Sequence, residues 1–128
     1  MDKEDVKKKL TEEEYHVTQE KGTERPFANA YHDNHESGMY DCKVCGTPLF
    51  SSDRKYDSGT GWPSFDEALP GAVKFEKDDS LGMARTEAIC AHCGAHLGHV
   101  FDDGPKNTTG KRFCTNSASL AFRKKGEN

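Results

Sequence analysis

Two cysteine motifs constrain this chain more than any other feature. Each has the form Cys-x-x-Cys-Gly, at 42–46 and 90–94, and 44 residues (46 to 89) separate the two inner cysteines. A two-residue spacer lets both sulfurs of a motif face one metal ion, and the glycine relieves the tight turn and leaves backbone N–H groups free to bond the sulfurs. Two such motifs form a closed site of four thiolates, which suits a structural zinc ion. The sequence therefore predicts one zinc per chain, held by Cys42, Cys45, Cys90 and Cys93.

Other interpretations of the motifs remain open at this point. The four residues could be reduced thiols in a strand core, or one motif could be a redox-active pair. Redox motifs of the thioredoxin type usually precede a helix in a βαβ unit, and the sequence shows no such unit. His92 lies inside the second motif and could replace a cysteine as ligand, although we expect an exposed histidine in the turn.

Length and composition favour one small domain, residues 1–128, that needs a stabilising cross-link such as a metal site. Apolar residues make up 33% of the chain and charged residues 31%, so the core is modest. The net charge of −4 argues against nucleic acid as a partner, and no apolar run is long enough to cross a membrane. The N-terminus lacks the apolar core of a secretory signal, so we expect a cytoplasmic, thiol-reducing setting.

The hydrophobic pattern predicts a mainly β fold, with antiparallel sheets, short N-terminal helices and the structural zinc site. A helix is expected at 12–20 within a helical segment 1–22, and Thr11 to Glu14 has the form of a capping box. Strands are expected at 40–44, 73–75, 83–89, 98–101, 112–114 and 120–122, with turn signals between most of them. We expect residues 123–128 to form a flexible tail.

The zinc site leaves one thiol, Cys114, in a setting that favours chemistry. On a strand, Arg112 and Asn116 project from the same face as Cys114, so a cation and a hydrogen-bonding amide lie beside the sulfur. His96 and His99 lie three residues apart with a glycine between them, which suits a turn that aims both rings into one cleft. A buried, inert cysteine and surface histidines are the alternative.

The only tryptophan, Trp62, lies in a loop rich in glycine and proline. It could cap the core or form the wall of an apolar pocket. A zinc-binding interaction module without chemistry is therefore a rival hypothesis to an enzyme. A zinc hydrolase is a weaker one, because four thiolates leave no open position for water.

The chain resembles the methionine-R-sulfoxide reductases of the B type from about residue 10 to residue 122. Besides the cysteine motifs, the resemblance is carried by YHVTQ at 15–19, GTERPF at 22–27, LFSS at 49–52, YDSGTGWPSF at 56–65, RTE at 85–87, CGAHLGHVFDDGP at 93–105 and RFCTNSASL at 112–120. The resemblance implies a tent-like arrangement of antiparallel β-sheets. It also implies repair of the R epimer of methionine sulfoxide in oxidised proteins or peptides.

The resemblance also assigns roles to individual residues. Cys114 would attack the sulfoxide sulfur as a thiolate and become a sulfenic acid. His99, with His96, would supply protons to the leaving oxygen, Asn116 would orient polar groups, and Arg112 would favour the thiolate. Trp62 would hold the methyl group of the substrate. Phe65 and Phe113 complete the expected substrate-binding set.

One position departs from the family pattern. Many members carry a resolving cysteine in the loop before the tryptophan, where this chain has Thr60. We therefore predict no intramolecular disulfide, and direct reduction of the sulfenic acid by thioredoxin, a glutaredoxin-like protein or a small thiol. Detachment of a zinc-site cysteine to resolve the sulfenic acid is the alternative. We expect the protein to be a monomer.

Overall fold

The computed structural model describes residues 7–20, 22–24, 31, 34–56, 58–78 and 85–125. Helix α2 (Glu12–Glu20) has the predicted bounds. Its capping box forms as expected, because Glu14 N–H donates to Thr11 Oγ1 at 3.1 Å and Thr11 N–H donates to Glu14 Oε1 at 2.9 Å. Of the predicted helical segment 1–22, residues 1–6 and 21 lie outside the described part of the chain.

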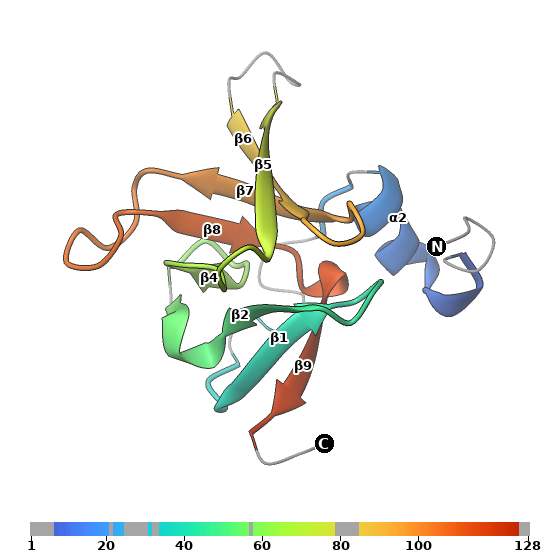
Figure 1. Ribbon diagram of the computed structural model, residues 1–128, viewed down its shortest axis with the longest axis horizontal. Coiled ribbons are helices and arrows are strands. Elements are labelled where there is room, and N and C mark those ends of the chain that lie inside the picture. Colours follow the sequence, from blue (N-terminus) through green and yellow to red (C-terminus); the bar gives the residue numbers. More distant parts are fainter. Residues whose placement is uncertain are drawn as a thin grey trace.

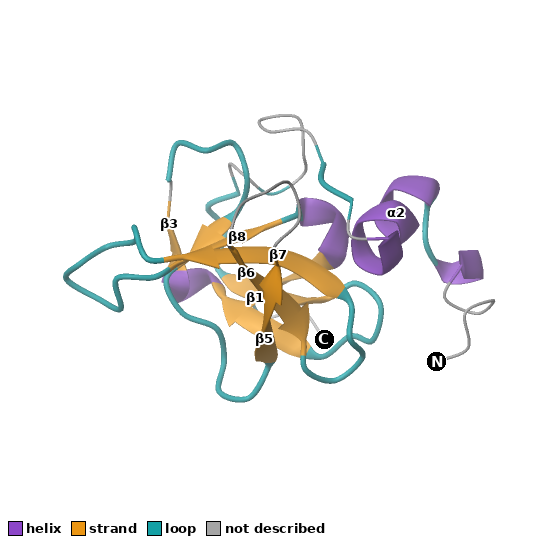
Figure 2. Cartoon of the chain, turned by 90° about the horizontal axis from the view of Figure 1, so that it is seen from above, coloured by secondary structure: helices purple, strands orange, loops and turns teal. Residues whose placement is uncertain are grey.

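The strands of the described chain form two antiparallel sheets (Figures 1 and 2). The smaller sheet has the order β2 (Pro48–Ser51), β1 (Gly38–Cys42), β9 (Leu120–Lys124). The larger has the order β3 (Lys55–Tyr56), β4 (Ser64–Phe65), β8 (Arg112–Thr115), β7 (His96–Phe101), β6 (Arg85–Cys90), β5 (Val73–Asp78). Two short 3₁₀ helices, η1 (Ser52–Arg54) and η3 (Ser117–Ser119), follow β2 and β8. The prediction of a mainly β fold is confirmed.

The alternation of side chains along β4 and β8 separates the core from the opposite face of the large sheet. Phe65 lies opposite Phe113 in the register, and both are buried in the hydrophobic core. Phe50 stacks on Phe65 with ring centroids 4.3 Å apart. The neighbouring pair, Ser64 and Cys114, projects to the other face because successive residues of a strand alternate. Cys114 is thus placed by the packing of the residue before it.

Several strands differ from their predicted bounds. Strand β5 continues to Asp78 and β7 begins at His96, while strands β2, β3 and β4 are additional. Part of the expected strand 83–89 lies outside the described residues. The expectation of a tail from residue 123 is wrong at its start, because Arg123 and Lys124 belong to β9. Arg123 holds the strand in place through two hydrogen bonds to Asp41, at 3.1 and 3.3 Å.

No helix in the described part of the chain is long and apolar enough to cross a membrane.

Candidate active site and metal centre

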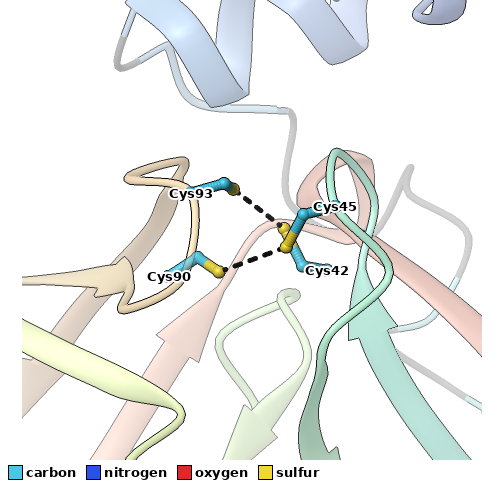
Figure 3. A group of neighbouring side chains, drawn as sticks. All are labelled: Cys42, Cys45, Cys90 and Cys93. Atoms are coloured by element: carbon cyan, nitrogen blue, oxygen red, sulfur yellow. Dashed lines mark hydrogen bonds between the residues drawn. The ribbon is translucent and has the colours of Figure 1, made fainter. Parts of the chain in front are cut away.

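The four predicted zinc ligands lie together where the two sheets meet (Figure 3). All four sulfurs lie within 4.8 Å of one another. The Cys42–Cys93 and Cys45–Cys90 sulfur pairs are each 3.6 Å apart, so each of these close contacts joins one motif to the other. A tetrahedral zinc ion with bonds of about 2.3 Å requires sulfurs roughly 3.8 Å apart. The donor set and its spacing therefore fit a closed structural metal site.

The backbone of the two motifs forms matching turns. Gly46 N–H donates to the Cys42 carbonyl at 2.8 Å, and Gly94 N–H donates to the Cys90 carbonyl at 2.9 Å. Both glycines have φ near +80°, at 79° and 81°, a conformation that other residues adopt at a cost. His92 is exposed and lies outside the ligand cluster, as expected.

Hydrogen bonds within the cluster shift the pKa values of its thiols in opposite directions. Hydrogen bonding with Cys90 and Cys93 raises the pKa of Cys42, whereas hydrogen bonding with Cys42 and Cys93 lowers the pKa of Cys90. A divalent cation at the centre would stabilise all four thiolates together.

The fifth sulfur, Cys114, lies outside this cluster on β8. It pairs with His99 of β7 on one side and with Ser64 of β4 on the other. Side chains paired directly across strands project from the same face of a sheet with Cβ atoms about 5 Å apart. The structure therefore brings Cys114 and one imidazole together, as the sequence predicted.

Cys114 lies in a pocket of about 260 Å³. Among the predicted site residues, the pocket is lined by Cys114, His99, Asn116, Arg112 and Trp62. Sequence reasoning did not assign the other side chains that line it, among them Thr23, Thr60, Arg85 and Phe101. Its walls thus combine apolar rings with cations and hydroxyls.

The two histidines occupy different positions. His99 lines the pocket and its Nε2 lies 2.7 Å from Asp78 Oδ2, so the carboxylate fixes the orientation of the ring. His96 is 3% exposed, does not line the pocket, and bonds through Nδ1 to Glu87 Oε2 at 2.7 Å. The two rings meet edge to face with centroids 5.5 Å apart. His96 therefore supports His99 rather than facing a ligand.

Arg112 supplies positive charge beside the thiol. Its guanidinium lies 4.4 Å from the centre of the Phe101 ring, and its Nε donates to Asp103 Oδ1 at 2.9 Å. Burial raises the pKa of the Cys114 thiol, while Arg112 and a hydrogen bond with Thr60 act in the opposite direction. The predicted effect of Arg112 on the thiolate has the expected sign, but burial outweighs it.

This balance predicts the pH dependence of thiol reactivity. Since only the thiolate reacts and the pKa lies above its ordinary value of 9.0, alkylation of Cys114 should accelerate with rising pH. We expect the iodoacetamide rate, followed by mass spectrometry of the Cys114 peptide, to rise about tenfold per pH unit below that pKa. The Thr60→Val variant should react more slowly at each pH. A plateau below pH 8 would contradict the burial argument.

Asn116 and Trp62 are held by backbone groups. Asn116 is buried, and its Nδ2 donates to the Leu97 carbonyl at 3.3 Å. The indole Nε1 of Trp62 donates to the Glu24 carbonyl at 3.0 Å. Of the two interpretations of Trp62, the structure favours a half-buried side chain on the pocket wall.

Phe65 and Phe113 lie in the hydrophobic core and do not line the pocket. Phe65 has no exposed surface and Phe113 is 6% exposed. Both were expected to contact substrate, but the alternation of the strand turns them away from the face that carries Cys114. Their place in the structure is below the site, where they support the strand that carries the thiol.

Asp78 and Glu87, the carboxylates behind the two histidines, were missed by sequence reasoning. Glu87 belongs to the motif quoted at 85–87. Once β6 is paired with β7, Glu87 lies directly opposite His99, and this position could have indicated a carboxylate beside the histidines. Asp78 reaches His99 from β5, the edge strand two strands away, and no spacing in the sequence indicates that contact.

Comparisons with known proteins agree on the family. The profile of the SelR domain matches residues 10–124. The chain is 56% identical over 119 residues to methionine-R-sulfoxide reductase B3, mitochondrial, of Mus musculus, covering 92% of this chain and 47% of that protein. It is 55% identical over 122 residues to peptide methionine sulfoxide reductase MsrB of Leptospira interrogans, covering 94% of this chain and 92% of that protein.

A further relative and a solved structure extend the comparison. The MsrB of Methanosarcina mazei is 53% identical over 122 residues, covering 94% of this chain and 86% of that protein. The crystal structure of the Mis18 "Yippee-like" domain is similar with a TM-score of 0.54 and 18% identity, covering 72% of this chain and all of that domain. At that identity the likeness concerns the fold alone.

Proposed function

Because the chain belongs to the SelR family of B-type methionine-R-sulfoxide reductases, we propose that it reduces the R epimer of methionine sulfoxide in oxidised proteins. The observation that carries the proposal is the position of Cys114, which lies opposite His99 in a pocket walled by Trp62. A binding module without chemistry has no need for a separate thiol beside an imidazole.

The first step transfers one oxygen atom to the protein. The Cys114 thiolate attacks the sulfoxide sulfur and forms a transient S–S bond to it. The protonated oxygen then moves to the Cys114 sulfur as both the S–O bond and this S–S bond break, which leaves Cys114 as a sulfenic acid. The thiolate loses two electrons and the sulfoxide gains them. Methionine then leaves the pocket as a thioether.

The residues around Cys114 can stabilise or neutralise the charges that develop in this step. The sulfoxide oxygen gains negative charge as its bond to sulfur breaks, so it needs a proton donor. His99 can supply that proton, and Asp78 fixes the orientation of the ring through Nε2. Arg112 favours the thiolate before attack.

The shape of the pocket supports selection of one epimer. An apolar wall at Trp62 suits the methyl group of the sulfoxide, while His99 and Asn116 offer polar groups for its oxygen. When methyl and oxygen have separate places, only one configuration at sulfur presents its face to Cys114. The other epimer would place its oxygen against the indole.

The sulfenic acid is then reduced by an external thiol. Two thiols convert it to the Cys114 thiol, one water and a disulfide of the donor. Among the described cysteines, the four outside the pocket form the metal cluster, and Thr60 lies beside Cys114 in the loop before Trp62. Thioredoxin, a glutaredoxin-like protein or a small thiol in a reducing compartment fits this need. We propose zinc as the metal, with a structural role.

A single-turnover experiment tests both halves of this proposal. The reduced protein is mixed with one equivalent of dabsyl-methionine sulfoxide, R or S epimer, without a thiol donor. We expect the R epimer to yield one equivalent of methionine and one added oxygen on the Cys114 peptide, and the S epimer to yield neither.

Two outcomes would contradict the proposal at different points. Equal turnover of both epimers would contradict the assigned selectivity. A disulfide between Cys114 and any of Cys42, Cys45, Cys90 or Cys93 would show that a zinc-site cysteine resolves the sulfenic acid.

A further inference from the structure

A buried carboxylate lies next to the pocket on a segment that the reaction above does not use. Glu24 directly follows Thr23, which lines the pocket, and is only 6% exposed. A buried carboxylate is unfavourable unless hydrogen bonds compensate for the lost water. Burial raises the pKa of Glu24, while hydrogen bonds from backbone amides act against that change. The contacts of Glu24 must therefore explain why it is there.

Both carboxylate oxygens bind the turn that follows the catalytic strand. Ser117 N–H donates to Glu24 Oε2, and Ala118 N–H donates to Oε1 at 2.8 Å. The side chain of Asn116, the residue before these amides, makes no capping hydrogen bond to them. The Glu24 carboxylate accepts these N–H groups instead of the Asn116 side chain, so the Asn116 amide group is available for other hydrogen bonds.

The backbone of Glu24 then contacts two residues of the pocket. Its N–H donates to Asn116 Oδ1 at 3.2 Å. Its carbonyl accepts the indole N–H of Trp62 at 3.0 Å. Asn116 is 92 residues and Trp62 is 38 residues away in sequence, so one residue joins three distant segments.

We propose that Glu24 is a positioning residue, whose carboxylate anchors segment 22–24 so that its backbone holds Asn116 and Trp62 in their places in the pocket. This inference rests on the proposed sulfoxide reduction at that site. Glu24 holds these two side chains by hydrogen bonds and does not touch the reacting sulfur, although its charge raises the pKa of Cys114. Removing its carboxylate should release the indole and disturb the apolar wall while the two sheets remain folded.

The test compares Glu24→Gln and Glu24→Ala with a matched control, Glu20→Gln. Glutamine keeps the size of the side chain but offers one acceptor oxygen to two N–H groups. Glu20 is exposed at the end of α2, so its replacement removes a charge near in sequence without touching the site. Trp62 is the only tryptophan, so its fluorescence reports on the pocket wall alone.

We expect both Glu24 variants to show red-shifted Trp62 emission and faster quenching by acrylamide, with a folded circular dichroism spectrum. For the R sulfoxide, KM should rise on the order of tenfold, while kcat falls less than about threefold. The control should match the parent protein in every readout. A lower melting temperature with unchanged emission and unchanged KM would overturn the proposal, since it would leave Glu24 a purely structural role.

A measurement on the parent protein guards against variants that fail to fold. Hydrogen exchange of the single indole N–H, followed by nuclear magnetic resonance, should be slow because the Glu24 carbonyl accepts it. Exchange as fast as in a free peptide would overturn the proposal. Neither exchange nor fluorescence requires turnover, so a protein that fails to reduce sulfoxide contradicts the proposed function and leaves the inference about Glu24 to its own readouts.

Discussion

The Cys114→Ser variant is expected to lose sulfoxide reduction by at least about a thousandfold while it keeps its fold and its metal. A serine hydroxyl stays protonated at neutral pH and cannot take up the sulfoxide oxygen, whereas a thiolate takes it up to become a sulfenic acid. The change removes one sulfur from a residue outside the metal cluster, so the four-cysteine site remains complete. Turnover of the R sulfoxide with dithiothreitol, metal content and melting temperature measure the three expected results.

The outcome also separates the two classes of function that the sequence left open. A zinc-binding interaction module would be indifferent to this substitution, since it uses no nucleophile. Activity within tenfold of the parent protein would show that Cys114 is not the nucleophile. A large loss of metal or melting temperature would show that Cys114 has a structural role that the geometry does not indicate.

The sequence alone was sufficient wherever local spacing determines geometry. The Cys-x-x-Cys-Gly spacing predicted the turns at Gly46 and Gly94, and the capping box predicted the start of α2. The alternation around Cys114 likewise placed a cation and an amide beside the thiol. In each case the interacting residues lie within five positions of one another, so no knowledge of strand pairing is needed.

The relation between the histidines shows where local spacing fails. In a regular strand, residues three apart project from opposite faces, and His96 and His99 both belong to β7. The pairing of β6 with β7 skips Leu97, and this irregularity brings both rings to one face. Leu97 has no exposed surface, so burial in the core fixes the bulge. The sequence predicted two neighbouring rings, but not that Glu87 would keep His96 out of the pocket.

The short strands and the distant carboxylates could not be predicted from the sequence, for a related reason. Strands β3 and β4 have two residues each, too few for a period to appear. Asp78 meets His99 because β5 pairs with β6 and β6 with β7. Such contacts depend on the register of several strands together, and a single sequence does not determine that register.

The Cys90→Ser variant is expected to give the opposite pattern to Cys114→Ser. Cys90 ends β6 in the large sheet, while Cys42 ends β1 in the small sheet, so a metal ion held by the four cysteines would join the two sheets. Binding of a structural zinc ion contributes directly to folding, and a small, polar chain has little else to replace it. We expect the metal to be lost and the melting temperature to fall by roughly 10 °C or more.

The matched control for this variant is Cys114→Ser, the same substitution at the cysteine outside the cluster. Chelation of the metal from the parent protein should lower the melting temperature as Cys90→Ser does, and should have no further effect on the Cys90→Ser variant. An unchanged melting temperature after both treatments would contradict the structural role of the metal. If instead Cys90→Ser kept its metal and stability but lost turnover, a zinc-site thiol would belong to the redox chemistry, and the separation of four binding sulfurs from one reactive sulfur would be wrong.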